Sequence, residues 1–272
     1  MEKVLLSIII AVSGLSAVSS PAGRQHYFVY DQKNFTEARR YCREKYTDLA
    51  TIDNIDNVKT LNNMADLSRM VNSSYSYRAW IGLYDDVDSW KWSLSNSSFY
   101  KPGGTEFRLW GTGEPNNEFG NEHCAEMNIT GLWNDIDCER SRRAVCVDVT
   151  GPKETFNLTP MSMNWTQAQS YCRDHHTDLA SMRNMTENQK VRDVAAGYRV
   201  WIGLSRDSWK WLDGSKSSFR YWSEKTKEPN NSAGDEACVN AHFIDSGKWE
   251  DFPCYEKRVF ICYGEWLFQR KC

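Results

Sequence analysis

Apolar residues recur with a helical spacing soon after residue 34. Tyr41 and Cys42 follow Ala38 at three and four residues, which is the spacing of a helix face packed on a core. Thr36 lies just before them and can cap the helix by accepting a hydrogen bond from a first-turn N–H. A second helix is expected over about residues 54–70.

Short apolar runs predict buried strands at residues 80–83, 144–147 and 259–262. Between residues 93 and 133 the chain is instead rich in Gly, Asn, Ser and Pro, which is the composition of a long loop. Loops of that length are usually functional or disordered. Because one cysteine lies inside this stretch and another just after it, we expect a tethered functional loop.

The whole pattern occurs twice along the chain. Five motifs recur in the same order: 34–42 at 164–172, 47–50 at 177–180, 80–83 at 201–204, 89–92 at 208–211, and 114–117 at 228–231. We therefore predict two tandem domains with almost no linker between them, copy one at residues 24–150 and copy two at residues 152–265, followed by a tail at residues 266–272. In copy two the helices are expected after Thr166 and over about residues 185–196.

The first residues predict export. A short apolar run from Val4 to about Val12 is followed by small residues, so residues 1–20 are interpreted as a signal peptide. The run is too short for a membrane anchor, and no later stretch approaches 18 apolar residues. We expect a secreted, extracellular protein without a transmembrane segment.

Composition narrows the function further. The 272 residues carry 33 Lys and Arg against 36 Asp and Glu, and this near-balance argues against nucleic-acid binding. Aromatic residues make up 13 % of the chain, which excludes a disordered protein. Nine cysteines indicate disulfides in an oxidising compartment. Each copy contains four, and Cys272 is left over, either as a free or capped thiol or as an interchain disulfide that makes a homodimer.

Oxygen ligands for a metal gather in the long loop of copy one. They are Glu114, Asn116, Glu122, Asn134 and Asp135. Carboxylates and carboxamides are the donors that Ca²⁺ prefers, and these five leave part of its coordination shell open. Pro115 separates the first two, and a cis bond there would let both side chains point the same way.

Both copies resemble the C-type lectin-like domain, through the helix motif around Cys42, the Trp-Ile-Gly-Leu strand, the Glu-Pro-Asn loop and Trp-Asn-Asp. The resemblance implies an α+β fold with two helices, small antiparallel sheets and two disulfides per domain. It implies the pairs Cys42–Cys146, Cys124–Cys138, Cys172–Cys262 and Cys238–Cys254. It also implies that Glu114, Asn116, Glu122, Asn134 and Asp135 form a calcium site, the first four also binding sugar, with Glu-Pro-Asn typical of mannose, fucose and N-acetylglucosamine.

Copy two departs from this pattern. Glu228, Asn230, Glu236 and Asp251 match, but Glu250 stands where the family has Asn. Glu250 offers oxygen to calcium yet cannot donate to a sugar hydroxyl. Asn230 also begins a glycosylation sequon, and a glycan there would obstruct the site. We therefore expect calcium and sugar to bind mainly in copy one.

Other motifs have plainer interpretations. The tryptophans at 80, 90, 92, 201, 209 and 211 are expected to anchor core and loops, and Asp85, Asp86 and Asp88 to form a solvated acidic turn. The family's auxiliary carboxylates beside the main site are replaced here by Asn117 and His123. The glycosylation candidates are Asn34, Asn72, Asn96, Asn128, Asn157, Asn164 and Asn184.

Three function classes follow. The first is a secreted calcium-dependent lectin that binds mannose-type glycans on microbial or host glycoproteins. The second is a protein-binding or structural module with little sugar binding, which Glu250 favours for copy two. The third, a glycosidase that uses Glu114 and Glu122, is disfavoured because calcium ligation would hold both carboxylates ionised, whereas a glycosidase needs one raised pKa. No enzymatic activity is expected.

Overall fold

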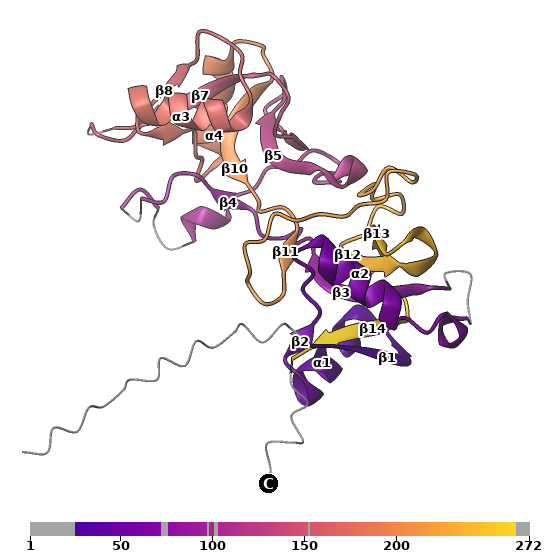
Figure 1. The fold of residues 1–272 in the computed structure, drawn as a ribbon. Helices are drawn as coiled ribbons and strands as arrows, with labels where there is room; N and C mark the ends of the chain where they lie inside the picture. The colour runs from indigo at the N-terminus through magenta and orange to yellow at the C-terminus, as the bar shows by residue number, and fades with distance from the viewer. Residues whose placement is uncertain (1–24, 72–75, 97, 101–102, 152, 265–272) are drawn as a thin grey trace, which may run out of the picture.

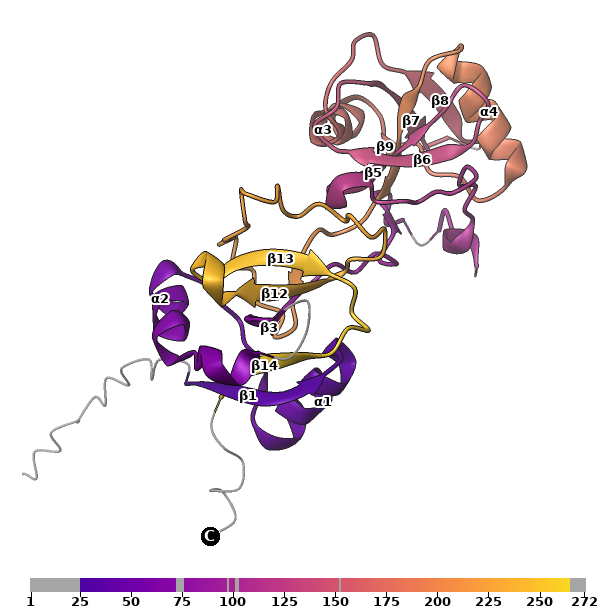
Figure 2. The ribbon, with the colours of Figure 1, turned by 90° about the vertical axis from the view of Figure 1, so that its right-hand side faces the viewer.

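The computed structural model describes residues 25–71, 76–96, 98–100, 103–151 and 153–264, and these form two lobes (Figure 1). Each lobe is built on a seven-stranded sheet that carries two α-helices. The terminal lobe contains both ends of the described chain, and the central lobe contains its middle, as the turned view also shows (Figure 2). The α+β architecture predicted from the sequence is confirmed.

The terminal lobe has the strand order β1-β14-β3-β12-β13, with β11 paired to β3 and β2 paired to β14. All its pairings are antiparallel except that of β14 with β3. Its elements are β1 (His26–Lys33), α1 (Phe35–Lys45), β2 (Asp48–Leu49), α2 (Ile55–Met64), the 3₁₀ helix η1 (Leu67–Met70), β3 (Arg78–Tyr84), β11 (Lys210–Trp211), β12 (Cys238–His242), η4 (Phe243–Asp245), β13 (Lys248–Phe252) and β14 (Arg258–Tyr263).

The central lobe repeats this plan with the order β6-β5-β10-β7-β8, with β4 paired to β10 and β9 paired to β7. Here β10 and β7 form the parallel pair. Its elements are β4 (Lys91–Trp92), η2 (Gly104–Glu106), η3 (Glu118–Gly120), β5 (Glu122–Met127), β6 (Trp133–Asp137), β7 (Arg143–Asp148), β8 (Thr155–Leu158), α3 (Trp165–His175), β9 (Asp178–Leu179), α4 (Met185–Ala195) and β10 (Val200–Ser205).

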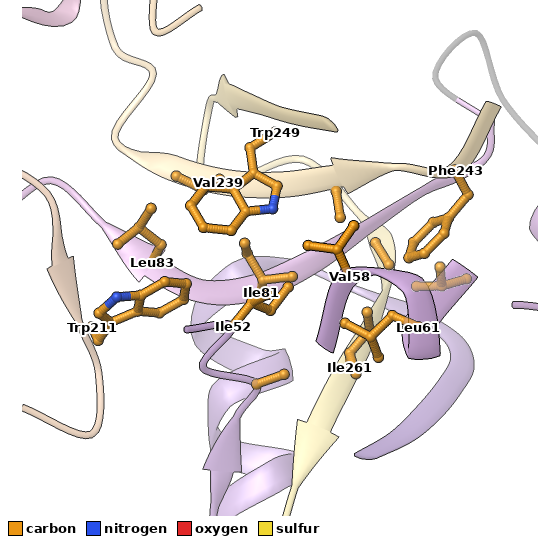
Figure 3. Packing of buried hydrophobic residues seen from close by; sticks show 14 of the residues in the cluster. Ile52, Val58, Leu61, Ile81, Leu83, Trp211, Val239, Phe243, Trp249 and Ile261 are labelled. Carbon is orange, nitrogen blue, oxygen red and sulfur yellow. The ribbon is translucent and has the colours of Figure 1, made fainter. Parts of the chain in front are cut away.

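The lobes do not coincide with the two copies. The first half of copy one, β1 to β3, folds with the second half of copy two, β11 to β14, and the remaining halves form the central lobe. The core of the terminal lobe therefore mixes both copies: Ile52 and Ile81 pack with Trp211, Val239 and Trp249 (Figure 3). Because β3 and β10 carry the same Trp-Ile-Gly-Leu sequence, either strand fits the partner strands of either copy.

This exchange corrects two of the four disulfides implied by the resemblance. The structure pairs Cys42 with Cys262 and Cys146 with Cys172, so the expected pairs Cys42–Cys146 and Cys172–Cys262 are wrong. The reason is that α1 packs beside β14 of copy two, and α3 beside β7 of copy one. The two short-range pairs, Cys124–Cys138 and Cys238–Cys254, are confirmed.

The helices begin two residues earlier than the threonines suggested. Asn34 and Asn164 are the N-caps of α1 and α3, and each side chain accepts a hydrogen bond from the third helical residue, Glu37 or Gln167. The side chains of those residues bond back to the N-cap N–H, which completes a capping box. Thr36 and Thr166 are therefore first-turn residues, not caps.

Within the described ranges, no helix combines the length and apolar character that a membrane crossing requires. The predicted signal peptide at residues 1–20, the tail at 266–272 with Cys272, and Asn72 lie outside the residues that the structure describes.

Candidate metal and sugar site

The loop of copy one is organised around one buried carboxylate. Asp135 lies on β6, two residues after a fully buried tryptophan, and its side chain points into the loop. Its two oxygens accept hydrogen bonds from the backbone N–H groups of Asn116, at 3.0 Å, and Asn117, at 2.8 Å. The Glu114–Pro115 bond is cis. Asp135 thereby ties the Glu-Pro-Asn segment to the sheet.

Glu122 joins the same cluster from the start of β5. Its Oε2 accepts a hydrogen bond from the Glu118 N–H at 2.8 Å, and its own N–H donates to Asn117 Oδ1 at 3.2 Å. Asn117 has φ +48°, a left-handed conformation that Asn tolerates better than most residues. Because the exchange occurs before residue 114, every predicted ligand of copy one stays in one lobe.

The carboxylates of this cluster repel one another. Burial, together with the adjacent Asp135, raises the pKa of Glu114 to about 7. Burial also raises the pKa of Glu122 to about 8; the N–H of Glu118 opposes the shift, and the charges of Asp135, Glu118 and Glu114 add to it. Glu114 Oε2 is buried without a hydrogen-bond partner. An unpartnered oxygen within crowded carboxylates fits a divalent cation.

Acidic groups alone do not complete this site. Among the described residues, no three His, Cys, Asp or Glu side chains converge into a metal cage. The sequence-based prediction adds the amide oxygens of Asn116 and Asn134 to the carboxylates. Asn116 is exposed, and Glu114 and Asn134 are half-buried, so an outside ligand can reach this edge of the loop.

Copy two repeats the scaffold in the terminal lobe. Glu228–Pro229 is cis, and Asp251 accepts hydrogen bonds from the Asn230 and Asn231 N–H groups, both at 2.9 Å. Glu228 Oε2 is again buried without a partner. Burial and the neighbouring Asp251 raise the pKa of Glu228 to about 9, and burial raises the pKa of Glu236.

Two ligand positions of copy two have other partners. Both oxygens of Glu250 are engaged: Arg78 donates to them from Nε at 2.6 Å and from Nη2 at 3.2 Å, and His242 Nδ1 lies 3.0 Å from Oε1. Burial opposes ionisation of Glu250, but these hydrogen bonds outweigh it and lower its pKa to about 2. Asn230 Nδ2 donates to Glu228 Oε1 at 2.7 Å. In copy one the Asn134 amide is likewise engaged, since its Nδ2 donates to the Asp135 carbonyl at 2.7 Å. Copy two therefore differs from copy one chiefly at Glu250.

The sequence of copy two alone could not reveal the partner of Glu250, because Arg78 belongs to copy one. Arg199 of the central lobe occupies the position equivalent to Arg78. Its glutamate partner lies on β5, the neighbour of the strand that carries the equivalent of Glu250. Arg199 donates to Glu126, which lies opposite Asn134 in the sheet, whereas Asn240 lies opposite Glu250. In each lobe, one glutamate of the paired strands (β5 and β6, or β12 and β13) therefore forms an ion pair with an arginine.

The predicted acidic turn is only partly solvated. Asp86 and Asp88 reach solvent, but Asp85 is buried and pairs with Arg206 of copy two, which corrects that expectation. The loops of the two copies also meet, because Asn231 Nδ2 donates to the carbonyl of Asn117 at 2.9 Å. These contacts join opposite copies, so no motif within one copy reveals them.

The remaining predictions concern surface and core. Of the six tryptophans expected to be anchors, five are buried and Trp90 is half-buried. Glycan attachment stays a prediction. The described sequon asparagines lie at the helix N-caps or in β8 and surface turns: Asn34, Asn96, Asn128, Asn157, Asn164 and Asn184.

Both copies of the chain match one family of known domains. Residues 31–148 and 161–264 match the lectin C-type domain. L-selectin of Mus musculus is 35 % identical over 119 residues, which cover 40 % of this chain and 32 % of that protein. E-selectin of Bos taurus is 34 % identical over 138 residues, which cover 48 % of this chain and 24 % of that protein.

The chain thus spans a third or less of these relatives' own length. Among solved structures, human lithostathine is 13 % identical with a TM-score of 0.38, covering 97 % of this chain and 99 % of its own. The mouse scavenger receptor C-type lectin carbohydrate-recognition domain is 15 % identical with a TM-score of 0.35, covering 91 % and 98 %.

Proposed function

Because this chain belongs to the C-type lectin domain family, we propose that it is a calcium-dependent carbohydrate-binding protein whose main sugar site is in copy one. Its ligands would be mannose-type glycans on microbial or host glycoproteins. The observation that carries the proposal is the copy-one cluster. Glu114, Glu122 and Asp135 crowd together, and one buried glutamate oxygen lacks a partner.

Five side chains would hold the ion: Glu114, Asn116, Glu122, Asn134 and Asp135. When bound, Ca²⁺ supplies coordination for one lone pair of each of two neighbouring sugar hydroxyls. The carboxylates of Glu114 and Glu122 would accept hydrogen bonds from those hydroxyls, and the amides of Asn116 and Asn134 would donate hydrogen bonds to the hydroxyl oxygens. Asn116 already accepts a hydrogen bond from the Glu118 N–H through Oδ1, which orients its NH₂ group to donate elsewhere.

For copy two we propose a different function, that of a structural or protein-binding surface with little sugar binding. Glu250 is held by Arg78 and His242, and the Asn230 amide is used by Glu228. Glu228, Glu236 and Asp251 still make a partial calcium site. A glycan on Asn230 would reduce sugar access further.

Retention on mannose–agarose tests the proposal. The full chain should bind with calcium and elute with EDTA, and Asn116→Asp should remove retention because it replaces a hydrogen-bond donor with an acceptor. The matched copy-two variant, Asn230→Asp, should leave retention intact. Retention that survives EDTA, or its absence with calcium present, would contradict the proposal.

Specificity gives a second test. Exchanging Glu114→Gln together with Asn116→Asp moves the donor and acceptor to opposite sides of Pro115, so preference should shift from mannose toward galactose. An unchanged preference on a glycan array would show that these residues do not select the sugar.

We further propose that the protein acts outside the cell and that Cys272 links two copies of it. One weak sugar site gains useful affinity only when several sites act together. Non-reducing electrophoresis of the secreted protein should show a dimer that Cys272→Ser converts to monomer, and a monomer without this change would contradict the linkage.

A further inference from the structure

A buried ion pair lies where the chain passes between the lobes. Arg206 Nη1 donates to Asp85 Oδ1, and the two side chains are only 1 % and 0 % exposed. Asp85 follows β3 of the terminal lobe, and Arg206 follows β10 of the central lobe. The pair therefore joins one lobe to the other inside the protein.

Asp85 and Arg206 occupy the same position in their copies, two residues after the glycine-leucine that ends Trp-Ile-Gly-Leu. Their backbones also make equivalent contacts: the Asp85 N–H donates to Ala237 at 2.8 Å, and the Arg206 N–H donates to His123 at 2.9 Å. Two equivalent positions thus meet, and they carry opposite charges. Two like copies would bury two like charges there, which is strongly unfavourable.

One side chain connects this ion pair to the candidate calcium loop. Asn117 Nδ2 donates to Asp85 Oδ2 at 3.2 Å, while Asn117 Oδ1 accepts from the Glu122 N–H at 3.2 Å. The Asn117 N–H donates to Asp135 at 2.8 Å. A single buried asparagine thereby touches the junction pair and two predicted ligands.

The other lobe supports the same residue from a second side. Asn231 Nδ2 donates to the carbonyl oxygens of Asn117, at 2.9 Å, and Asn116, at 3.3 Å. Gly120 lies so close to Pro229 that an added Cβ would be 3.2 Å from the proline Cβ. The loop that carries Glu114, Asn116 and Glu122 is therefore packed on the terminal lobe.

We propose that the Asp85–Arg206 pair positions the copy-one calcium loop through Asn117, so that calcium affinity there depends on the docking of the two lobes. This inference rests on the proposed function. Without the pair, Asn117 loses the charged acceptor that fixes its amide, and the loop must then be ordered when the ion binds. Coupling of this kind is reciprocal, so calcium must also tighten the junction.

Three variants of the full chain test the proposal. Asp85→Leu with Arg206→Met removes both charges and the acceptor for Asn117 and replaces the ion pair with apolar side chains, a change that folded proteins often tolerate. Asn117→Gly removes the connecting side chain and keeps the left-handed backbone. Each should weaken copy-one calcium binding about tenfold, the loss expected of one hydrogen bond to a charged group. Asp85→Asn with Arg206→Gln restores an acceptor and should recover most of the affinity.

Hydrogen exchange of the peptide covering residues 114–124, measured across a calcium titration, gives the affinity of this site alone. The same experiment should show slower exchange at residues 84–90 and 205–210 when calcium is added. Lys91→Gln with Asp207→Asn is the control, because it removes an exposed ion pair at the junction that does not touch the loop.

The outcomes separate the two proposals. If the unaltered chain shows no calcium protection at residues 114–124, both the proposed function and this inference fail. If it shows protection and the Leu/Met and Gly variants, with native disulfide pairs, bind calcium equally well, only this inference fails. A loss as large in the control variant would also overturn it.

Discussion

Lowering the pH from 8 to 6 should weaken calcium binding in copy one by about two to three orders of magnitude. Glu114 and Glu122 must be ionised to bind, and their pKa values are raised to about 7 and about 8. Each protonated group divides the apparent affinity by 1 + 10^(pKa − pH). The product of the two factors is about 2 at pH 8 and about 1,000 at pH 6.

The same shifts set the sign of the stability change. Both pKa values are higher in the folded chain than in the unfolded chain, so protonation of these groups stabilises the fold. This stabilisation is complete at pH values below the ordinary glutamate pKa of the unfolded chain. That stabilisation is lost as the pH rises through 7 and then 8. The increase in melting temperature that calcium produces over EDTA should therefore grow from pH 5 to pH 8.

Calorimetry in two buffers of different ionisation enthalpy counts the protons. In a Glu228→Gln background, calcium binding should release about two protons at pH 6 and fewer than one at pH 8. Glu118→Gln removes a neighbouring charge that raises both pKa values, so it should move the curve to lower pH. Calcium binding with equal affinity at pH 6 and 8, and without proton release, would refute the reasoning.

Three further predictions concern the fold. Non-reducing peptide mapping should recover Cys42 linked to Cys262, and a Cys42–Cys146 peptide would contradict the exchange of halves. Arg78→Met leaves Glu250 buried without its cation and should cost about 3–5 kcal/mol in urea unfolding; a loss below about 1 kcal/mol would be inconsistent with the ion pair. Trp133→Ala empties a fully buried site that three aromatic rings contact edge-on, and should cost about 3–5 kcal/mol by thermal unfolding, against little change for the exposed Phe119→Ala.

Sequence predicted the main helices and strands, and it placed the candidate ligands of copy one in one loop, because both depend on nearby residues. The strand around Trp80, the helix around Cys42 and the loop from Glu114 to Asp135 each lie within one continuous stretch, where spacing and residue type act directly. The short disulfides Cys124–Cys138 and Cys238–Cys254 were implied by the family resemblance, and they hold because each joins two cysteines of one copy.

Sequence could not choose between partners that look alike. Because β3 and β10 share their central sequence, a helix motif in either copy fits the second half of either copy, and the pairing of Cys42 was assigned to the wrong one. Asp85 gave a similar difficulty: within its own copy it reads as a polar turn, and only Arg206, 121 residues later, accounts for its burial.

The covalent connections of the exchanged chain have a consequence for proteolysis. A protease that cuts only one of the two crossing segments, near residue 87 or near residue 207, would leave a single molecule, because the other segment still joins the lobes. Cutting both would release the central lobe as one continuous piece. The terminal lobe would then survive as two fragments held by Cys42–Cys262, a product that only reducing agent would divide.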